Sequence, residues 1–440
     1  MKTKIRIGCG AGFSGDRLDP TLTLIKEGGL DYLVLECLAE RTIALAQKRK
    51  LQNPLLGYDP LLERRIEALL SPLMENKVRL ITNMGAANPH AAAQKIIEIA
   101  RSKNMKVKVA AVTGDDVSDR INPEDKTIET GHAVSASGKL LSANAYLGAP
   151  GIIEALVIGA DIIITGRVAD PSLFIAPMIY AFGWAMDDYD ILGKGTVIGH
   201  LMECAGQITG GYFADPGKKD VPGMARLGHP FVDVFPDGSG IIGKVEGTGG
   251  IISMQTAKEQ LLYEVINPHE YFTPDVIADF TSARLEEVGS NKVRVYGGSG
   301  KKKPDTYKVS VGYQAYHLGE GEITYAGSNA VGRAKLAGEI VQERLKHEFP
   351  QLRIDLIGQN SVHGDSFHSG QVPYEVRLRI AGKAPSPQLA ALIGEEVEAL
   401  YTNGPAGGGG VRKYVHEVVG IISTLIARDK VSQHVTIQES

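Results

Sequence analysis

The sequence predicts an α/β protein with an N-terminal parallel-sheet α/β domain and a C-terminal α+β domain with antiparallel strands. In the first half, continuous apolar runs alternate with helical stretches, which is typical of a parallel sheet covered on both faces. A segment rich in Gly, Pro and charge, residues 213–230, separates this half from one with alternating apolar residues. We therefore expect an α/β domain at 1–220 with a ligand crevice at its strand ends, and an α+β domain at 221–440.

Five apolar runs of the first half predict strands that begin near residues 4, 31, 78, 107 and 161. The helical periodicity between and after them predicts helices over 59–76, 89–104, 149–160, 170–184 and 194–211. In the second half, 291–298 and 306–327 have the pattern of an antiparallel meander, and 352–358 and 374–382 are further strands. Long amphipathic segments predict helices over 329–349 and 387–401.

A glycine motif of the G-x-G-x-x-G type, with Gly10, Gly12 and Gly15, follows the first strand. In dinucleotide-binding folds the helix starts inside this motif, and an acidic residue about 20 positions on binds the ribose; Glu36 has that spacing. Pro20, however, suits only the first turn of a helix, and Asp19 before it is a good N-cap. We therefore expect the helix to start near Pro20 and the loop to be a glycine-rich active-site or packing loop that binds no NAD or NADP. Binding of NAD or NADP that Gly12→Val abolishes would contradict this expectation.

Polar residues follow each predicted parallel strand, and ligands of such sheets bind beyond the carboxyl ends of the strands. Each residue alone could be an ordinary helix cap, as Asp170 before Pro171 illustrates. Together they predict an acidic crevice with one arginine that could hold a carboxylate. Its candidate substrate-binding residues are Gly10, Gly12, Asp16, Glu36, Asn83, Asn88, Arg167 and Asp170, and Asp115 and Asp116 are candidate catalytic residues.

His200, Glu203 and Cys204 occupy positions i, i+3 and i+4 of a predicted helix and so share one face. His200 and Glu203 could act as a general acid/base pair in which Glu203 orients the imidazole. A metal site at the three side chains and a purely structural polar edge are the alternatives.

Two glycine-rich segments could bind the phosphates of a coenzyme A ester through free backbone N–H groups. One contains Gly249, Gly250 and Ser253, and the other precedes Arg412. The alternative is that both segments are mobile connections between structural elements, because such connections are also rich in glycine. His363, Asp365 and His368 share a turn-rich loop, which makes them a weaker candidate for metal binding.

Composition limits the classes of protein. With 43% hydrophobic and 22% charged residues the chain should fold fully, and a net charge of −4 favours neither nucleic acid nor a membrane surface. The three cysteines are too few and too scattered for disulfides or a closed zinc site, which favours a cytoplasmic protein without a structural metal. We expect no tightly bound cofactor, no membrane span and a homo-oligomer.

Several segments, taken together and in order, resemble the acyclic terpene utilisation family. They include "IGCGAGFSGDR", "TNMGAANP", "NAYLGAPGI", "GADIIITGRVADPSL", "GHLMECAGQITGGYF" and "TGGIISMQTAKEQLLYEV". The resemblance implies a cytosolic protein of terpenoid or branched-chain catabolism that acts on a carboxylate or an acyl-CoA. Because some relatives carry an additional small ferredoxin-like domain, it is also compatible with a separate small partner chain of that kind.

The leading hypothesis is a lyase or hydratase that acts on a branched hydroxy acid or its coenzyme A ester. His200 and Glu203 would move the proton, Asp115 or Asp116 would assist, and Arg167 would hold a carboxylate. A non-catalytic acyl-CoA-binding subunit of a larger complex is the second hypothesis, and an oxidoreductase that uses the Gly10–Gly15 loop is the third.

Overall fold

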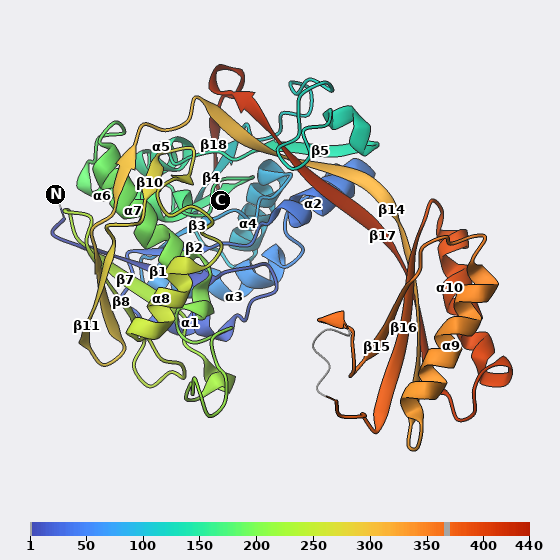
Figure 1. Cartoon of the computed structure of the whole chain (residues 1–440). Coiled ribbons are helices and arrows are strands. Elements are labelled where there is room, and N and C mark those ends of the chain that lie inside the picture. The colour runs from blue at the N-terminus through green and yellow to red at the C-terminus, as the bar shows by residue number, and fades with distance from the viewer. Residues whose placement is uncertain (1, 365–369) are drawn as a thin grey trace. The chain divides into compact units, whose positions relative to one another are not determined.

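The computed structural model describes residues 2–364 and 370–440 of the chain and has the predicted α/β class (Figure 1). The chain forms two compact units. The first contains Met1–Ala136, Leu140–Gly312 and Ile421–Ser440, and the second contains Ser137–Lys139 and Tyr313–Gly420. The expected boundary at 213–230 lies inside the first unit, because the strands on both sides of it join one sheet.

The first unit is built on a ten-stranded mixed sheet with the order β11-β12-β8-β7-β1-β2-β3-β6-β4-β18. Its five central strands are parallel and are the five predicted runs. They are β1 (Ile5–Ala11), β2 (Tyr32–Leu35), β3 (Arg79–Thr82), β6 (Ile162–Thr165) and β4 (Lys108–Thr113). Antiparallel strands extend both edges: β7 (Pro230–Val234), β8 (Gly240–Lys244), β12 (Lys292–Tyr296), β11 (Arg284–Gly289) and, on the other side, β18 (His434–Glu439).

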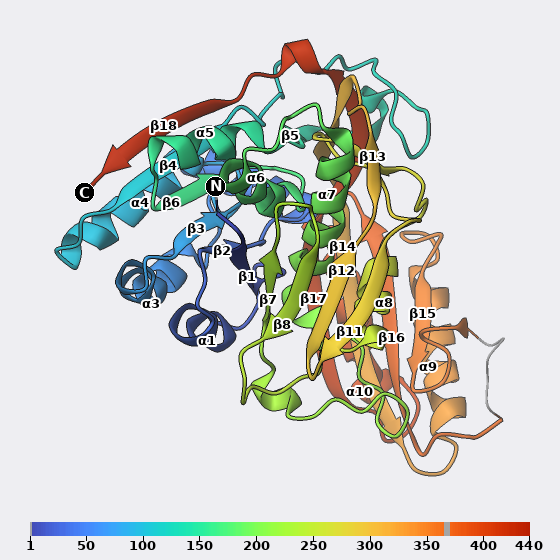
Figure 2. The same cartoon turned by 90° about the vertical axis from the view of Figure 1, so that its left-hand side faces the viewer.

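Helices cover both faces of the parallel strands, as Figure 2 shows. One face packs against α1 (Asp19–Glu27), α3 (Leu62–Glu75) and α4 (Pro89–Ser102), and the other against α5 (Pro150–Ile158), α6 (Ser172–Phe182) and α7 (Tyr189–Glu203). Side chains such as Leu33, Ile66, Leu69 and Ile96 are fully buried in the core of the first face. This continuous burial explains why the parallel strands are apolar along their whole length.

Smaller elements complete the first unit. They are α2 (Glu40–Gln52), α8 (Met254–Leu262), β5 (Leu140–Ala145), a three-stranded sheet of β13 (Ser299–Lys301), β10 (Ile277–Asp279) and β9 (Tyr271–Phe272), and 3-10 turns at Val134–Ser137, Ala205–Gln207, Met224–Arg226 and Arg428–Lys430. Within the described ranges, no helix combines the length and the apolar character needed to cross a membrane.

The second unit is an α+β sandwich in which α9 (Ala330–Leu345) and α10 (Pro387–Asn403) cover one face of a sheet (Figure 1). The sheet has the order β15-β16-β14-β17. It contains β15 (Arg353–Ile357), β16 (Glu375–Ala384) and those parts of β14 (Thr306–Ala326) and β17 (Gly409–Ala427) that lie within Tyr313–Gly420. Its β-α-β-β-α-β sequence of elements and this strand order are those of a ferredoxin-like unit.

Thr306–Ala326 form one long strand, so the meander expected within 306–327 is wrong. Two glycines within this strand allow a helix to pack closely against it. A Cβ atom on Gly319 would lie 2.0 Å from the carbonyl oxygen of Ala390, and one on Gly321 would lie 2.7 Å from the side chain of Val397, both on α10. Glycine in a strand therefore marks close approach here, and not a turn.

Candidate active site

A cavity of about 710 Å³ lies at the carboxyl ends of the parallel strands, within the first unit. The loops after β1, β2 and β6 line it together with the C-terminal end of α7 and the segment before β7. Six of the sequence-predicted site residues line it: Gly12, Asp16, Glu36, Arg167, Asp170 and Glu203.

Glu36 directly follows β2 and lines the cavity with a buried carboxyl group. Its Oε1 accepts hydrogen bonds from the backbone N–H of Leu38 (2.8 Å) and from the side-chain amide of Asn83 (2.9 Å), which leaves Oε2 to carry a proton. Burial, together with the nearby charge of Asp170, raises the pKa of Glu36 to about 8. Glu36 is therefore a carboxylic acid at neutral pH, and the fully buried Asn83 holds it in place without lining the cavity.

Arg167 is a buried cation in the wall of the cavity, with only 2% of its side chain exposed. Its Nη2 donates to Asp170 at 2.8 Å, and its guanidinium carbon lies 4.2 Å from the centre of the Tyr146 ring. Burial opposes its charge, but Asp170, Tyr146 and Glu36 raise the pKa of Arg167 above its usual value. Nε and Nη1 are buried and have no hydrogen-bond partner among the described residues. Two of the three guanidinium nitrogens therefore keep unpaired N–H groups in the cavity wall.

Asp115 supports Arg167 from behind and does not line the cavity. Its Oδ2 accepts from the backbone N–H of Arg167 and from the side chain of Asn144, both at 2.9 Å. Burial raises the pKa of Asp115 to about 6. Its position makes it a positioning residue for Arg167.

Glu203 and His200 form the pair that their spacing on α7 predicts, with 3.0 Å between Glu203 Oε1 and His200 Nδ1. Glu203 lines the cavity, whereas His200 is 1% exposed, does not line it, and packs against the rings of Tyr271 and Phe280. Burial raises the pKa of Glu203 to about 7, and its Oε2 has no hydrogen-bond partner in the part of the chain that the structure describes. Glu203 can therefore take up or release a proton near neutral pH, with His200 orienting it.

The glycine-rich loop after β1 packs against the end of α7. Helix α1 begins at Asp19, beyond the last glycine, with Leu18 and not Asp19 at the N-cap position. A Cβ atom on Gly12 would lie 2.6 Å from the backbone of Cys204, so this glycine serves close packing. Gly10 does not line the cavity, because its carbonyl oxygen accepts from Thr21 Oγ1 (2.6 Å) and His229 Nδ1 (3.1 Å).

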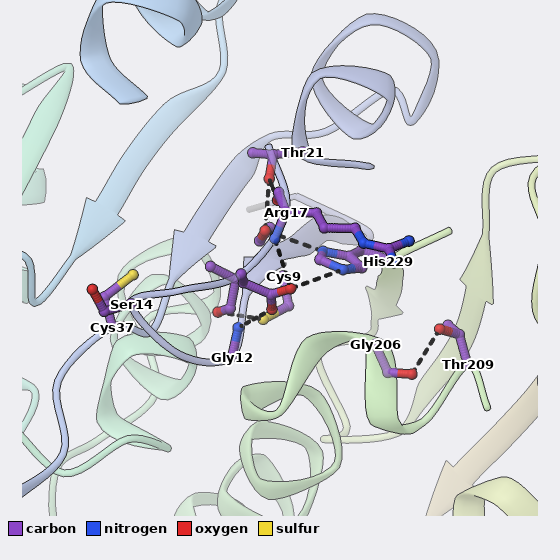
Figure 3. Close-up of polar contacts among 12 residues, drawn as sticks. Cys9, Gly12, Ser14, Arg17, Thr21, Cys37, Gly206, Thr209 and His229 are labelled. Carbon is purple, nitrogen blue, oxygen red and sulfur yellow. Dashed lines mark hydrogen bonds and ion pairs between the residues drawn. The ribbon is translucent and has the colours of Figure 1, made fainter. Parts of the chain in front are cut away.

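His229 is a cavity residue that sequence reasoning missed, since it lies in the segment interpreted as a domain boundary. Its imidazole points toward the loop that carries Gly12 and Arg17 (Figure 3). Because Nδ1 donates to a carbonyl oxygen, Nε2 is the free base position, 3.7 Å from Asp16 Oδ1. Burial lowers the pKa of His229, so it is a neutral base beside Asp16.

Several other lining residues do not come from the ends of the five parallel strands. Tyr146 donates its hydroxyl proton to Glu40, and Lys308 lies 3.4 Å from the same carboxylate. Although burial opposes its charge, the Tyr146 hydroxyl and Arg167 lower the pKa of Glu40 to about 2. The remaining polar residues of the wall are Arg17, Cys204, Gln207, Tyr212, Tyr263, Glu264 and Tyr271.

Two predicted strand-end residues lie elsewhere. Asn88 caps α4 by accepting from the N–H of Ala91, and its amide donates to the carbonyl oxygens of Pro54 and Leu56. Asp116 accepts from the N–H and hydroxyl of Ser118. Both have ordinary turn and cap roles and do not line the cavity.

The predicted anion-binding segments do not line this cavity either. The N–H groups of Gly249 and Gly250 are not free, because they donate to the carbonyl oxygens of Arg226 and Pro222, both at 2.7 Å. Ser253 forms a capping box with Thr256 at the start of α8. Arg412 lies on β17 in the second unit.

No group of three or more His, Cys, Asp or Glu side chains in the described ranges is arranged to hold a metal. Asp365 and His368, two of the three loop residues considered for metal binding, lie outside those ranges.

The pKa of Glu36 makes folding stability depend on pH. The carboxyl group keeps its proton in the folded state up to about pH 8, whereas its ordinary pKa is 4.5. The folded state is therefore progressively destabilised as the pH rises from about 4.5 to about 8. We expect Glu36→Gln to raise the free energy of unfolding by about 2–4 kcal/mol at pH 8 and to change it little at pH 4. Urea unfolding at the two pH values measures the difference, with the exposed Glu154→Gln as control; an equal effect at both would contradict it.

The comparison with protein families gives one match, to the family described as "Acyclic terpene utilisation family protein AtuA", over residues 5–437. No curated protein and no solved structure was found to be similar. The match includes nearly all of the first unit, the whole second unit and every residue that lines the cavity. The chain therefore belongs to the acyclic terpene utilisation family, and this membership implies a role in the use of acyclic terpenes.

Proposed function

We propose that the chain is a lyase or hydratase that adds water to, or removes it from, a branched carboxylic acid or its coenzyme A ester during terpenoid breakdown. The observation that carries this proposal is the buried Arg167 with two unpartnered nitrogens, in one cavity with two carboxyl groups whose pKa values lie near 7 and 8. An anion clamp, a base and an acid are the three groups that such chemistry needs.

In the dehydration direction, Glu203 takes the proton from the carbon next to the carboxyl or thioester group. The electrons of that C–H bond form the C=C bond, and the C–O bond to the hydroxyl group breaks. Glu36 donates its proton to the departing hydroxyl, which leaves as water. Arg167 stabilises the negative charge that develops on the carbonyl oxygen. Afterwards Glu203 holds a proton and Glu36 has lost one, and exchange with solvent restores both.

To test this proposal, the protein is incubated in D₂O with branched 3-hydroxy acids and with their coenzyme A esters. NMR then measures the incorporation of deuterium at the α-carbon and the formation of an alkene. We expect α-deuteration together with alkene formation. Binding without either change would favour a non-catalytic acyl-CoA-binding subunit. Absence of binding by all acids and esters would contradict the proposal.

The two carboxyl groups predict a bell-shaped pH profile of kcat/KM. Below about pH 7 Glu203 is protonated and cannot act as base, and above about pH 8 Glu36 is ionised and cannot act as acid. We expect a maximum between these values and a fall of about tenfold per pH unit on each side. Steady-state kinetics from pH 5 to 10 measure the profile, and a rate that is constant across this range would be incompatible with it.

A further inference from the structure

A second cavity, of about 640 Å³, adjoins the first within the same unit. Five residues line both cavities, and they are Tyr146, Asp170, Glu264, Tyr271 and Lys308. The two spaces therefore share a wall, and the two tyrosines are part of it. A ligand held by Arg167 has Tyr146 directly beside it, because the guanidinium carbon lies 4.2 Å from the centre of that ring.

The chemistry of the second cavity differs from that of the first. Away from the shared wall, apolar and aromatic side chains dominate its lining, and Ile128, Ile266, Phe272 and Leu425 are large apolar residues that leave at least half of their surface exposed (57%, 100%, 64% and 50%). They come from three separate segments of the sequence and meet at one cavity. Large apolar side chains gathered at an exposed site mark a binding site for an apolar group.

Tyr271 is held firmly in the shared wall. Its ring stacks on Phe280 with centroids 4.9 Å apart, and His200 lies 5.4 Å away. His200, which orients Glu203, therefore packs directly against Tyr271, which separates the two cavities. A chain that passes Tyr271 would have its polar end beside Glu203 and its apolar end in the second cavity.

We propose that the second cavity binds the hydrocarbon chain of the substrate, while Arg167 binds its carboxylate or thioester end. This inference rests on the proposed function for the head group only. The occupant is an aliphatic chain, because the far part of the lining offers mainly apolar contact and the polar groups gather at the shared wall. Affinity should then depend on chain length, independently of the head group.

The experiment measures dissociation constants of straight-chain carboxylates from butanoate to decanoate by calorimetry, with the matching primary alcohols as a second series. For the unaltered protein we expect each added CH₂ to tighten binding by up to about fourfold, which corresponds to ~0.8 kcal/mol. Phe272→Gln and Leu425→Gln should weaken decanoate binding by about tenfold or more and leave butanoate unchanged. The substituted side chains are largely exposed, so the fold should tolerate them.

Leu55→Gln is the matched control, since Leu55 is 72% exposed and lines neither cavity. It should behave as the unaltered protein does. Arg167→Met should weaken all carboxylates by the same factor and leave the dependence on length intact. If Arg167→Met has no effect while the dependence persists, the head-group proposal fails and this inference stands. Equal affinity for all chain lengths, or a dependence on length that Phe272→Gln and Leu425→Gln leave unaltered, would overturn the inference.

Discussion

Replacing Glu203 by glutamine is expected to lower kcat by about 10²- to 10⁴-fold, the usual contribution of a general base. The amide keeps the shape of the side chain, but it cannot accept the substrate proton. Substrate affinity should change little, because the loss is confined to the transition state. Steady-state kinetics with the substrate found by NMR measure both parameters, and melting curves verify the fold. Glu154→Gln, on the exposed surface of α5, is the control with the same chemical change.

His200 acts through Glu203, so its replacement supplies an independent check. His200→Asn should lower kcat by a similar factor and should also move the acidic limb of the pH profile, since the imidazole contact lowers the pKa of Glu203. The double variant should be little worse than either single one, as expected for two residues that work as a unit. Full activity of a folded His200→Asn protein would assign this pair a structural role.

The parallel core was predictable because its strands are buried on both faces and are therefore apolar along their length. The same reasoning could not find the structure of 306–326 and 409–427, where glycines that suggest turns or loops lie within long strands. Gly319 shows the cause, since it allows α10 to approach the strand, and helix packing is not visible in a local pattern. The division of the chain was mispredicted for a related reason, because β7 and β8 follow the Gly- and Pro-rich segment and still join the sheet of β1.

The candidate site was predictable in part. The rule that ligands bind beyond strand ends points to Glu36 and Arg167, and helical spacing points to Glu203; all three line the cavity. The strand-end rule cannot distinguish side chains that face the cavity from side chains that support them, because both kinds follow strands. Asn83 and Asp115 are supporting side chains of this kind.

His229 and Tyr146 reach the cavity through tertiary contacts alone. For Tyr146 a signal existed, because the segment "NAYLGAPGI" carried part of the family resemblance and no strand-end rule explained it. His229 precedes Pro230 at the start of an antiparallel strand, a position that no rule for parallel sheets considers.

Replacing Arg167 by methionine is expected to weaken carboxylate binding by at least about 30-fold and to lower kcat/KM by about 10²- to 10³-fold. Methionine fills much of the same volume but removes the charge and the two unpartnered nitrogens with their N–H groups. The loss also leaves Asp170 and Glu36 without the cation that lowers their pKa, so both should take up protons more readily. The alkaline limb of the pH profile should therefore move upward. Calorimetry with a short carboxylate and the pH profile of kcat/KM measure the two effects, and Arg294→Met, at an exposed position of β12, is the control.

A second substitution separates the loss of the anion clamp from a loss of stability. Removing Arg167 leaves the negative charge of the Asp170 carboxylate without its partner, which should destabilise the fold. Adding Asp170→Asn to Arg167→Met removes that charge and should restore much of the stability. It should not restore carboxylate binding, because the N–H donors are still missing. If binding returned with stability in the double variant, Arg167 would be a structural ion-pair partner of Asp170 and the anion clamp would have to lie elsewhere in the cavity.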